Sequence, residues 1–334
     1  MSAARLLVML AALLLSVPAH AVTINWVTVG DPNNAADTTG DPNPAGAVAD
    51  AFQIMKFEWT NSQYVDFLNA VDPNGTNPNS VYNANMGSDA RGGISFDTNA
   101  STGSKYAARA NMGDKPVNYV SWFDAARVAN WLQNGQGTGS TETGAYTLNG
   151  ATTGNAPAVN SGATYYIPTE DQWYKAAYYK GSGSNAGYWD YATQSDTAPT
   201  AVTADATGIG SAGSTGNFAN YNRGADWNGQ DGNVTTVGTN GGPSAYGAFD
   251  MGGTVYEWND LTGAAGSSRG LRGGDWGSVA FDLSSSSRLT FAPSFGNVSS
   301  GFRLAAVPEP STYAMALAGL ACGGYSMFRR RKQA

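Results

Sequence analysis

Residues 246–258 constrain the fold more than any other segment, because they combine aromatic residues, two adjacent glycines and two acids at fixed spacing. Gly252 and Gly253 supply the backbone freedom that a tight turn needs. The residues after the turn predict a short extended segment, in which successive side chains point to opposite faces. One face can therefore bind and the other can pack, with Val255 and Glu257 on one and Tyr256 and Trp258 on the other.

The two acids of this stretch raise the question of a bound cation. Asp250 precedes the glycine turn and Glu257 follows it. Together with carbonyl groups of the turn they could converge on calcium, a hard cation that takes oxygen ligands in flexible geometry. The alternative is a surface hairpin with two solvated acids, and the residues by themselves leave both open.

Composition indicates one large domain with many ordered loops. Only 13% of the 334 residues are charged, whereas glycine is abundant and there are nine Trp and seventeen Tyr. Buried aromatic residues can hold such loops in place. The formal net charge is −7, and most of the charged residues in the two terminal segments are basic, so the body of the chain is more acidic still. An acidic surface argues against a nucleic-acid partner.

The N-terminus has the pattern of a secretory signal peptide. One arginine, Arg5, precedes an apolar run at residues 6–17, and a small-residue cleavage pattern ends at Ala21. We therefore expect residues 1–21 to be removed on export. The alternative is a buried N-terminal helix.

The C-terminus carries a second address signal. Pro308, Glu309 and Pro310 precede an apolar run at residues 311–328, and residues 329–332 are all basic. A helix of that run would be roughly 27 Å long, near the lower limit for spanning a bilayer. The tail resembles the PEP-CTERM sorting signal of Gram-negative bacteria, which an exosortase recognises and cuts. This resemblance implies a transient inner-membrane anchor and a final place at the cell surface or in an extracellular matrix; an anchor that is never cut is the alternative.

Three segments of the body predict a helix with a capped N-terminus. Thr60 or Asn61 can cap a helix that runs to residue 71, with Tyr64, Phe67, Leu68 and Val71 as its apolar stripe. Ser121, with Asp124 three residues later, predicts a second helix with Ala125, Val128, Ala129 and Leu132 at helical spacing. Thr169 predicts a third, after a strand at residues 165–167. Strands are also predicted at residues 22–29 and 52–59.

Beyond Lys180 the sequence predicts no regular helix, only short strands and long loops to residue 305. Long loops in a compact domain are usually functional or need an internal constraint. The only cysteine, Cys322, lies in the C-terminal apolar run, so the body contains no disulfide. A bound metal ion is the natural substitute.

Taken in order, several motifs resemble the formylglycine-generating-enzyme, or sulfatase-modifying-factor, family. They are residues 56–61 with Tyr64 and Phe67, residues 116–122 with Asp124 and Ala125, residues 166–173, the stretch 246–258, residues 271–276, Arg288, and residues 301–304. The resemblance covers nearly all of residues 50–305. It implies an α+β, C-type-lectin-like domain with little regular secondary structure and long loops. We expect this domain at residues 22–306 and the sorting segment at residues 307–334.

The family resemblance also implies two structural calcium sites. The first would use Asp250, Glu257 and the carbonyl groups of Gly253 and Val255. The second would use Asn220, the carbonyl group of Tyr221, Asp231 and Asn233.

Catalysis is where the sequence departs from the family. The enzymes hold copper(I) with two active-site cysteines, and soft thiolates suit that ion. The corresponding region, residues 277–288, contains no cysteine, and a hydroxyl such as that of Ser278 cannot replace a thiolate. Iron-dependent relatives of this fold need a histidine triad, and the only histidine is His20, in the signal peptide. We therefore expect neither copper nor iron, and predict no catalytic residue.

These inferences predict an exported surface or matrix protein whose domain is catalytically inactive and acts as a calcium-stabilised binding or structural module. Its expected partners are the exosortase machinery, the membrane before processing, and a polysaccharide or matrix protein. The alternative is an enzyme of the same family, which either generates formylglycine or uses a chemistry independent of the cysteine pair.

Overall fold

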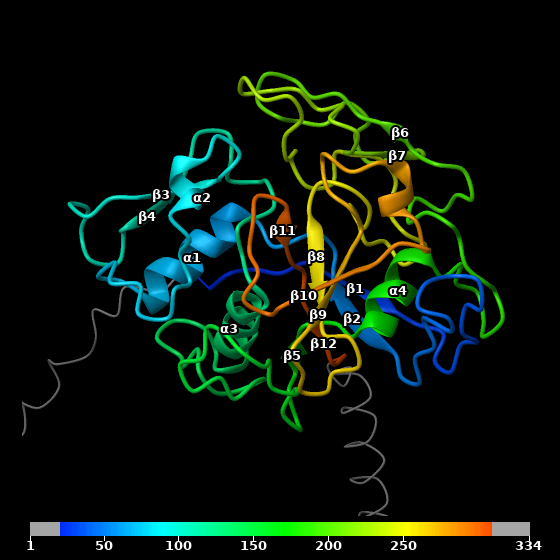
Figure 1. Cartoon of the computed structure of the whole chain (residues 1–334), viewed down its shortest axis with the longest axis horizontal. Helices are drawn as coiled ribbons and strands as arrows, with labels where there is room; N and C mark the ends of the chain where they lie inside the picture. The colour runs from blue at the N-terminus through cyan, green and yellow to red at the C-terminus, as the bar shows by residue number, and fades with distance from the viewer. Residues whose placement is uncertain (1–20, 309–334) are drawn as a thin grey trace, which may run out of the picture.

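The computed structural model describes residues 21–308, and short elements joined by long loops make up most of it (Figure 1). The helices are α1 (Asn61–Val71), α2 (Asn85–Ser88), α3 (Trp122–Gln133), α4 (Glu170–Tyr178) and the 3-10 helix η1 (Ala280–Leu283). The strands are β1 (Trp26–Val29), β2 (Phe52–Met55), β3 (Ile94–Phe96), β4 (Tyr106–Ala108), β5 (Tyr165–Tyr166), β6 (Thr200–Ala201), β7 (Phe218–Ala219), β8 (Tyr256–Asn259), β9 (Arg269–Arg272), β10 (Leu289–Phe291), β11 (Ser300–Gly301) and β12 (Ala305–Ala306). The α+β class with little regular structure is confirmed.

All three predicted helices form, and each begins at a predicted capping residue. Thr60, Ser121 and Thr169 accept a hydrogen bond from the backbone three residues on, and the side chain at that position bonds back to the cap. These reciprocal bonds satisfy backbone donors that the helix itself leaves unpaired. Within the described residues after α4 no α-helix follows, as predicted, and the 3-10 helix η1 is an element that the sequence did not predict.

Two four-stranded sheets organise the chain. In the first the strand order is β1-β2-β12-β5. The last strand, β12, pairs on one side with β2, near the start of the domain, and on the other with β5, near the middle of the sequence. In the second the order is β10-β9-β8-β11, with β8 from the stretch 246–258 inside it. The ends of the domain therefore close on each other, and β8 lies at the centre of the fold (Figure 1).

The predicted strand at residues 52–59 is too long, because β2 ends at Met55. The next residues bond individually to distant segments: Lys56 to Asn25, and Trp59 to Phe302 and Val117. The chain leaves the sheet there to reach the cap of α1. The predicted strand at residues 22–29 is likewise shorter, since β1 begins at Trp26.

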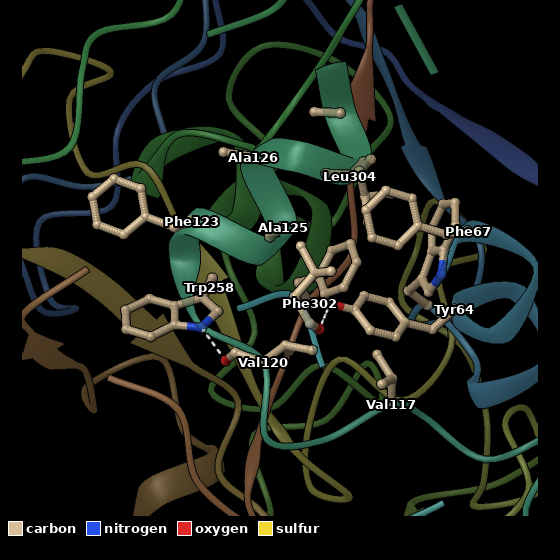
Figure 2. Packing of buried hydrophobic residues seen from close by; sticks show 14 of the residues in the cluster. Tyr64, Phe67, Val117, Val120, Phe123, Ala125, Ala126, Trp258, Phe302 and Leu304 are labelled. Carbon is tan, nitrogen blue, oxygen red and sulfur yellow. Dashed lines mark hydrogen bonds between the residues drawn. The ribbon is translucent and has the colours of Figure 1, made fainter. Parts of the chain in front are cut away.

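The main core surrounds α3, in which every residue except Gln133 is buried (Figure 2). Tyr64 and Phe67 of α1 pack there with Phe302 and Leu304, and the Trp258 indole of β8 donates to the Val120 carbonyl group at 3.0 Å. The predicted apolar stripe on α3, Ala125, Val128, Ala129 and Leu132, is therefore too narrow a description of the buried surface of this helix. The loops around α3 enclose its polar side as well.

Buried arginines tie the long loops to the elements. Arg127 pairs with Glu142, Arg269 with Asp260, Arg272 with Glu170 and Arg303 with Glu257, and all four arginines are at most 1% exposed. Each also donates to backbone carbonyl groups, Arg272 for example to Ser285 and Ser287. A planar guanidinium with five donors can satisfy several loop carbonyl groups at once. The guanidinium groups thus hold the long loops in place, a role that the sequence led us to expect of a bound metal ion alone.

None of the helices in residues 21–308 is long and apolar enough to cross a membrane. The predicted signal peptide, apart from Ala21, and the predicted membrane run at residues 311–328 lie outside the described residues.

Candidate functional site

The turn in the stretch 246–258 is built as the two glycines predicted. Gly253 has a φ of 88°, and a Cβ at this position would lie 2.2 Å from the carbonyl oxygen of Asn220. Only glycine fits there. Asp250 and Thr254 also have positive φ values, 56° and 63°, which are uncommon for residues with side chains. The backbone is held in this shape by the pairing of Gly253 with Asn220.

Both acids of the stretch are buried, so the alternative of a surface hairpin with solvated acids is wrong. Asp250 is 9% exposed and Glu257 is 1% exposed. Val255 and Trp258 are buried as well and Tyr256 is partly buried, so neither face of the predicted extended segment is open along its length. The period-2 pattern identified the strand, but β8 lies inside a sheet that other segments cover on both sides.

Glu257 forms an ion pair in the core. Its two carboxylate oxygens accept hydrogen bonds from the Arg303 guanidinium, both at 2.6 Å. The Trp173 indole donates to the same carboxylate at 2.8 Å. Arg303 also donates to the carbonyl groups of Met55 and Phe249, which join β2 and the stretch 246–258 to this point.

Asp250 belongs to a polar chain that reaches the second predicted calcium set. Its carboxylate accepts from the backbone of Gly238 and, at 3.0 Å, from the Asn240 amide. Thr235 donates to the Asn240 side chain at 2.7 Å and accepts from Asn220 at 2.9 Å. The sequence placed Asp250 and Asn220 in two separate sites, whereas the structure links them through buried hydrogen bonds.

Three buried polar atoms around Asn220 have no hydrogen-bond partner in the described chain. They are the side-chain oxygens of Asn220 and Thr254 and the amide nitrogen of Asn233. All three residues are fully buried. The Thr254 backbone donates to the Asn220 carbonyl group and the Asn220 amide to that of Asn233, so these residues are neighbours. Unpaired buried oxygens are a feature that a bound cation or water would explain.

Tyr221 and Asp231 are not part of this buried group. The Asp231 carboxylate is 68% exposed and pairs with Arg223 at 2.8 Å on the surface. The Tyr221 hydroxyl donates to the Pro199 carbonyl group, while its own carbonyl group accepts from Gly224. Buried hydrogen bonds thus connect Asn220, Asn233, Thr235, Asn240 and Asp250 into one polar layer beside Gly253. Asp231 lies outside this polar layer.

Glu58 is a buried acid that sequence reasoning missed. It is fully buried, neither carboxylate oxygen has a hydrogen-bond partner, and its nearest cation, Arg303, is 3.9 Å away. Burial raises the pKa of Glu58 well above its usual range, and the charges of Asp250 and Glu257 act in the same direction, while Arg303 opposes them. Glu58 stands in the motif 56–61 among aromatic residues, a context that could have marked it as buried.

The region that would hold copper in the related enzymes is a cluster of hydroxyl groups. The Ser278 hydroxyl donates to the Asp275 carboxylate at 2.9 Å and shares a hydrogen bond with the Tyr256 hydroxyl at 3.3 Å. The Ser284 hydroxyl donates to the Phe281 carbonyl group at 2.7 Å. Val279, just before η1, and Phe281, within it, are 58% and 61% exposed. These donors do not suit copper(I), which prefers soft sulfur ligands.

No group of three or more His, Cys, Asp or Glu side chains within residues 21–308 is arranged to hold a metal ion. Cys322 and His20 lie outside the described residues. Calcium at the two predicted sets of residues stays a prediction.

A crevice of about 280 Å³ opens beside the start of α1. Phe57 and Thr60 line it together with Asn25, Ser62 and Asp114, and Glu58 lies in its wall. Asn25, Ser62 and Asp114 are exposed, and their side chains make no hydrogen bond to the rest of the described chain. The Phe57 ring is held by Phe249, with ring centres 5.5 Å apart. An aromatic ring and uncommitted polar groups thus share one concave surface.

Comparison with solved structures finds distant similarity over most of the chain. Treponema denticola variable protein 1 is 19% identical, with 87% of this chain and 97% of that chain covered and a TM-score of 0.48. CarF is 19% identical, with 86% and 99% covered and a TM-score of 0.49. PvdO from Pseudomonas aeruginosa is 19% identical, with 86% and 93% covered and a TM-score of 0.42. No curated protein matches the sequence.

Comparison with family models gives two matches. The PEP-CTERM protein-sorting motif matches residues 306–332, which supports the predicted resemblance of the tail and implies export and recognition by exosortase machinery. The sulfatase-modifying factor enzyme 1-like domain matches residues 20–307, nearly all of the described chain. The chain therefore belongs to the sulfatase-modifying-factor family, and its fold is the α+β, C-type-lectin-like fold that the sequence motifs predicted.

Proposed function

We propose that this protein is a catalytically inactive member of the family, which acts at the cell surface or in the matrix as a binding or structural module. The observation that carries the proposal is the hydroxyl cluster at residues 277–288. Ser278 in that segment bonds to the Tyr256 hydroxyl and to the Asp275 carboxylate, and residues 22–306 contain no thiol or imidazole. A site without soft ligands cannot supply the copper chemistry of the related enzymes.

Copper(I) titration of the mature domain under anaerobic conditions tests the loss of catalysis. We expect no tight stoichiometric site, because the domain offers hydroxyl groups and carboxylates in place of thiolates. Ser278→Cys is the matched comparison, since it places one sulfur ligand in the same cluster. A tight site in the unmodified protein would overturn the proposal.

Calcium is part of the same proposal. The unpaired oxygens of Asn220 and Thr254 support it, because they are buried hard ligands next to Asn233 and Gly253. The fit at Asp250 and Glu257 is poorer, since the Glu257 carboxylate is already neutralised by Arg303. Asn220 is therefore the residue through which a bound calcium would act, by holding the loop at residues 220–235 against the turn at Gly253.

The crevice beside α1 supports a binding role. Its lining offers the amides of Asn25 and Gln63, hydroxyl groups, the Asp114 carboxylate and the Phe57 ring, and the Lys56 ammonium lies 5.4 Å from the centre of that ring. Rings pack against the apolar faces of sugars while polar groups bond to their hydroxyls, and the exposed Asp114 carboxylate repels acidic sugars, so we propose a neutral polysaccharide as the ligand.

A glycan array with the mature domain tests this role. We expect binding to neutral glycans that weakens when Asn25 and Asp114 are both replaced by Ala. Asn155→Ala is a matched control, because Asn155 is exposed and lies outside the crevice. Absence of any glycan binding would leave the structural role alone, and binding that survives the double replacement would show that the crevice is not the site.

A further inference from the structure

The sorting signal begins inside the folded sheet. Its match starts at Ala306, the last residue of β12. Ala305 and Ala306 are buried and pair with β2 on one side and β5 on the other. No spacer therefore separates the domain from the motif that the sorting peptidase reads.

The short distance from sheet to signal limits how a peptidase can approach. The Val307 backbone donates to the Thr164 carbonyl group at 2.9 Å, so the chain is still held at this residue. Four residue steps lead from Val307 to Ser311, where the apolar run starts, and they span at most about 14 Å. An enzyme that binds Pro308, Glu309 and Pro310 must come within that distance of the domain surface.

A groove of about 320 Å³ lies at this point of the surface. Its walls are mostly apolar and come from Val48, Ala49, Phe52, Tyr166, Val307 and Pro308. Gln172 bonds to the Tyr166 hydroxyl at 3.0 Å and stiffens one wall. Val307 is 48% exposed although it is apolar. The first residues of the signal thus form one wall of the groove, and the domain forms the others.

We propose that this groove is a docking surface for the sorting peptidase, which binds the domain and the Pro-Glu-Pro motif together. A protein that reaches the motif meets the groove at the same time, because Val307 and Pro308 belong to both. Burial of exposed apolar surface would then add to recognition of the motif. The peptidase would read a folded domain with β12 in place, rather than an extended tail.

Processing of the full-length precursor in cells that contain its exosortase tests the proposal. Ala49→Trp fills the groove from an exposed position, and Ala198→Trp introduces the same side chain on an exposed loop away from it. We expect Ala49→Trp to slow conversion of the precursor about five-fold or more, as for the loss of a central interface contact. Ala198→Trp should be processed at the normal rate. Equal melting temperatures of the two variants would exclude misfolding as the cause.

A spacer distinguishes docking from other effects. Six Gly and Ser residues inserted between Val307 and Pro308 add up to roughly 20 Å of reach, so the peptidase no longer needs to touch the groove. We expect Ala49→Trp to have no effect on processing when the spacer is present. Normal processing of Ala49→Trp without the spacer, or an equal delay with it, would overturn the proposal.

The chain's own tail is the competing occupant of the groove. If the tail occupied the groove, it would be held against the domain and protected from proteolysis. Trypsin cleavage of the purified precursor at the basic cluster 329–332, in the absence of the peptidase, tests whether the tail is held in this way. We expect Ala49→Trp and the unmodified precursor to be cut at the same rate. Faster cleavage of the variant would assign the groove to the tail and overturn docking of the peptidase.

Discussion

At the scale of single residues, the buried acids around Arg303 differ in what they contribute. Glu257 has three donors and a guanidinium partner, whereas Glu58 is buried without any hydrogen bond. A buried ion pair that loses one partner leaves an uncompensated charge, which is strongly destabilising. Glu58 makes no hydrogen bond and lies near Asp250 and Glu257, so its charged form contributes little to the stability of the fold.

We therefore expect Glu257→Gln to lower the free energy of unfolding by about 3 kcal/mol, because Arg303 would lose its counter-charge in the core. Glu58→Gln should leave stability unchanged or raise it, since it removes a buried acid and keeps the shape. Urea unfolding of both variants, followed by tryptophan fluorescence, measures the difference. A larger loss for Glu58→Gln than for Glu257→Gln would contradict this assignment of roles.

Two further buried acids predict how stability depends on pH. Burial raises the pKa of Asp260 to about 7 although Arg269 lies beside it, and burial raises the pKa of Asp124 to about 6. In the unfolded chain both would titrate near about 4. The folded state then holds protons on these two acids that the unfolded state releases, so their contribution to stability is fully present below about pH 4 and is lost as the pH rises through 6 and 7. The free energy of unfolding, measured in urea from pH 4 to 8, should fall over this window, and Asp260→Asn should remove the upper part of the fall.

At the scale of elements, the helices start where local sequence dictates, and tertiary contacts decide what covers them. Thr169 and Gln172 form the capping box of α4, and the acids Glu170 and Asp171 lie in its first turn. Glu170 is also the partner of Arg272, which joins α4 to the loop at residues 285–287. The start of α4 thus carries both a local and a long-range constraint.

Thr169→Ala should cost about 1 kcal/mol in unfolding free energy, because the backbone donor of Gln172 loses its acceptor. Thr169→Ser keeps a hydroxyl group at the cap and should cost much less. Chemical denaturation of the two variants measures both values. Equal losses for Ala and Ser would mean that the methyl group, rather than the cap, stabilises this position.

At the scale of the whole molecule, long loops are held by groups distant in sequence. Four buried arginines supply carbonyl contacts, and the polar layer from Asn220 to Asp250 holds the loop at residues 220–240 against the turn. The body contains no disulfide, so these contacts and any bound ion hold the loops, as disulfides do in small secreted domains.

Removal of calcium tests how much of that task an ion performs. A thermal melt of the mature domain with EDTA should give a lower melting temperature than one with calcium, because an ion that binds only the folded state stabilises it. Asn220→Ala should abolish this difference between the two conditions. An unchanged melting temperature in EDTA would remove calcium from the proposal and leave the arginines as the constraint.

The sequence by itself determined the features that depend on neighbouring residues or on which residue types the chain contains. The caps at Thr60, Ser121 and Thr169 act over three residues, and the adjacent glycines Gly252 and Gly253 indicate a turn from the sequence alone, so these features were readable from the order of residues. The lack of thiols in residues 22–306 is equally plain in the sequence. The tertiary structure alone decided that Glu257 meets Arg303 from 46 residues away, that Asn220 pairs with Gly253, and that Glu257 and Trp258, on opposite faces of β8, are both buried. These pairings depend on which distant segments pack together, and no local pattern of side chains encodes that choice.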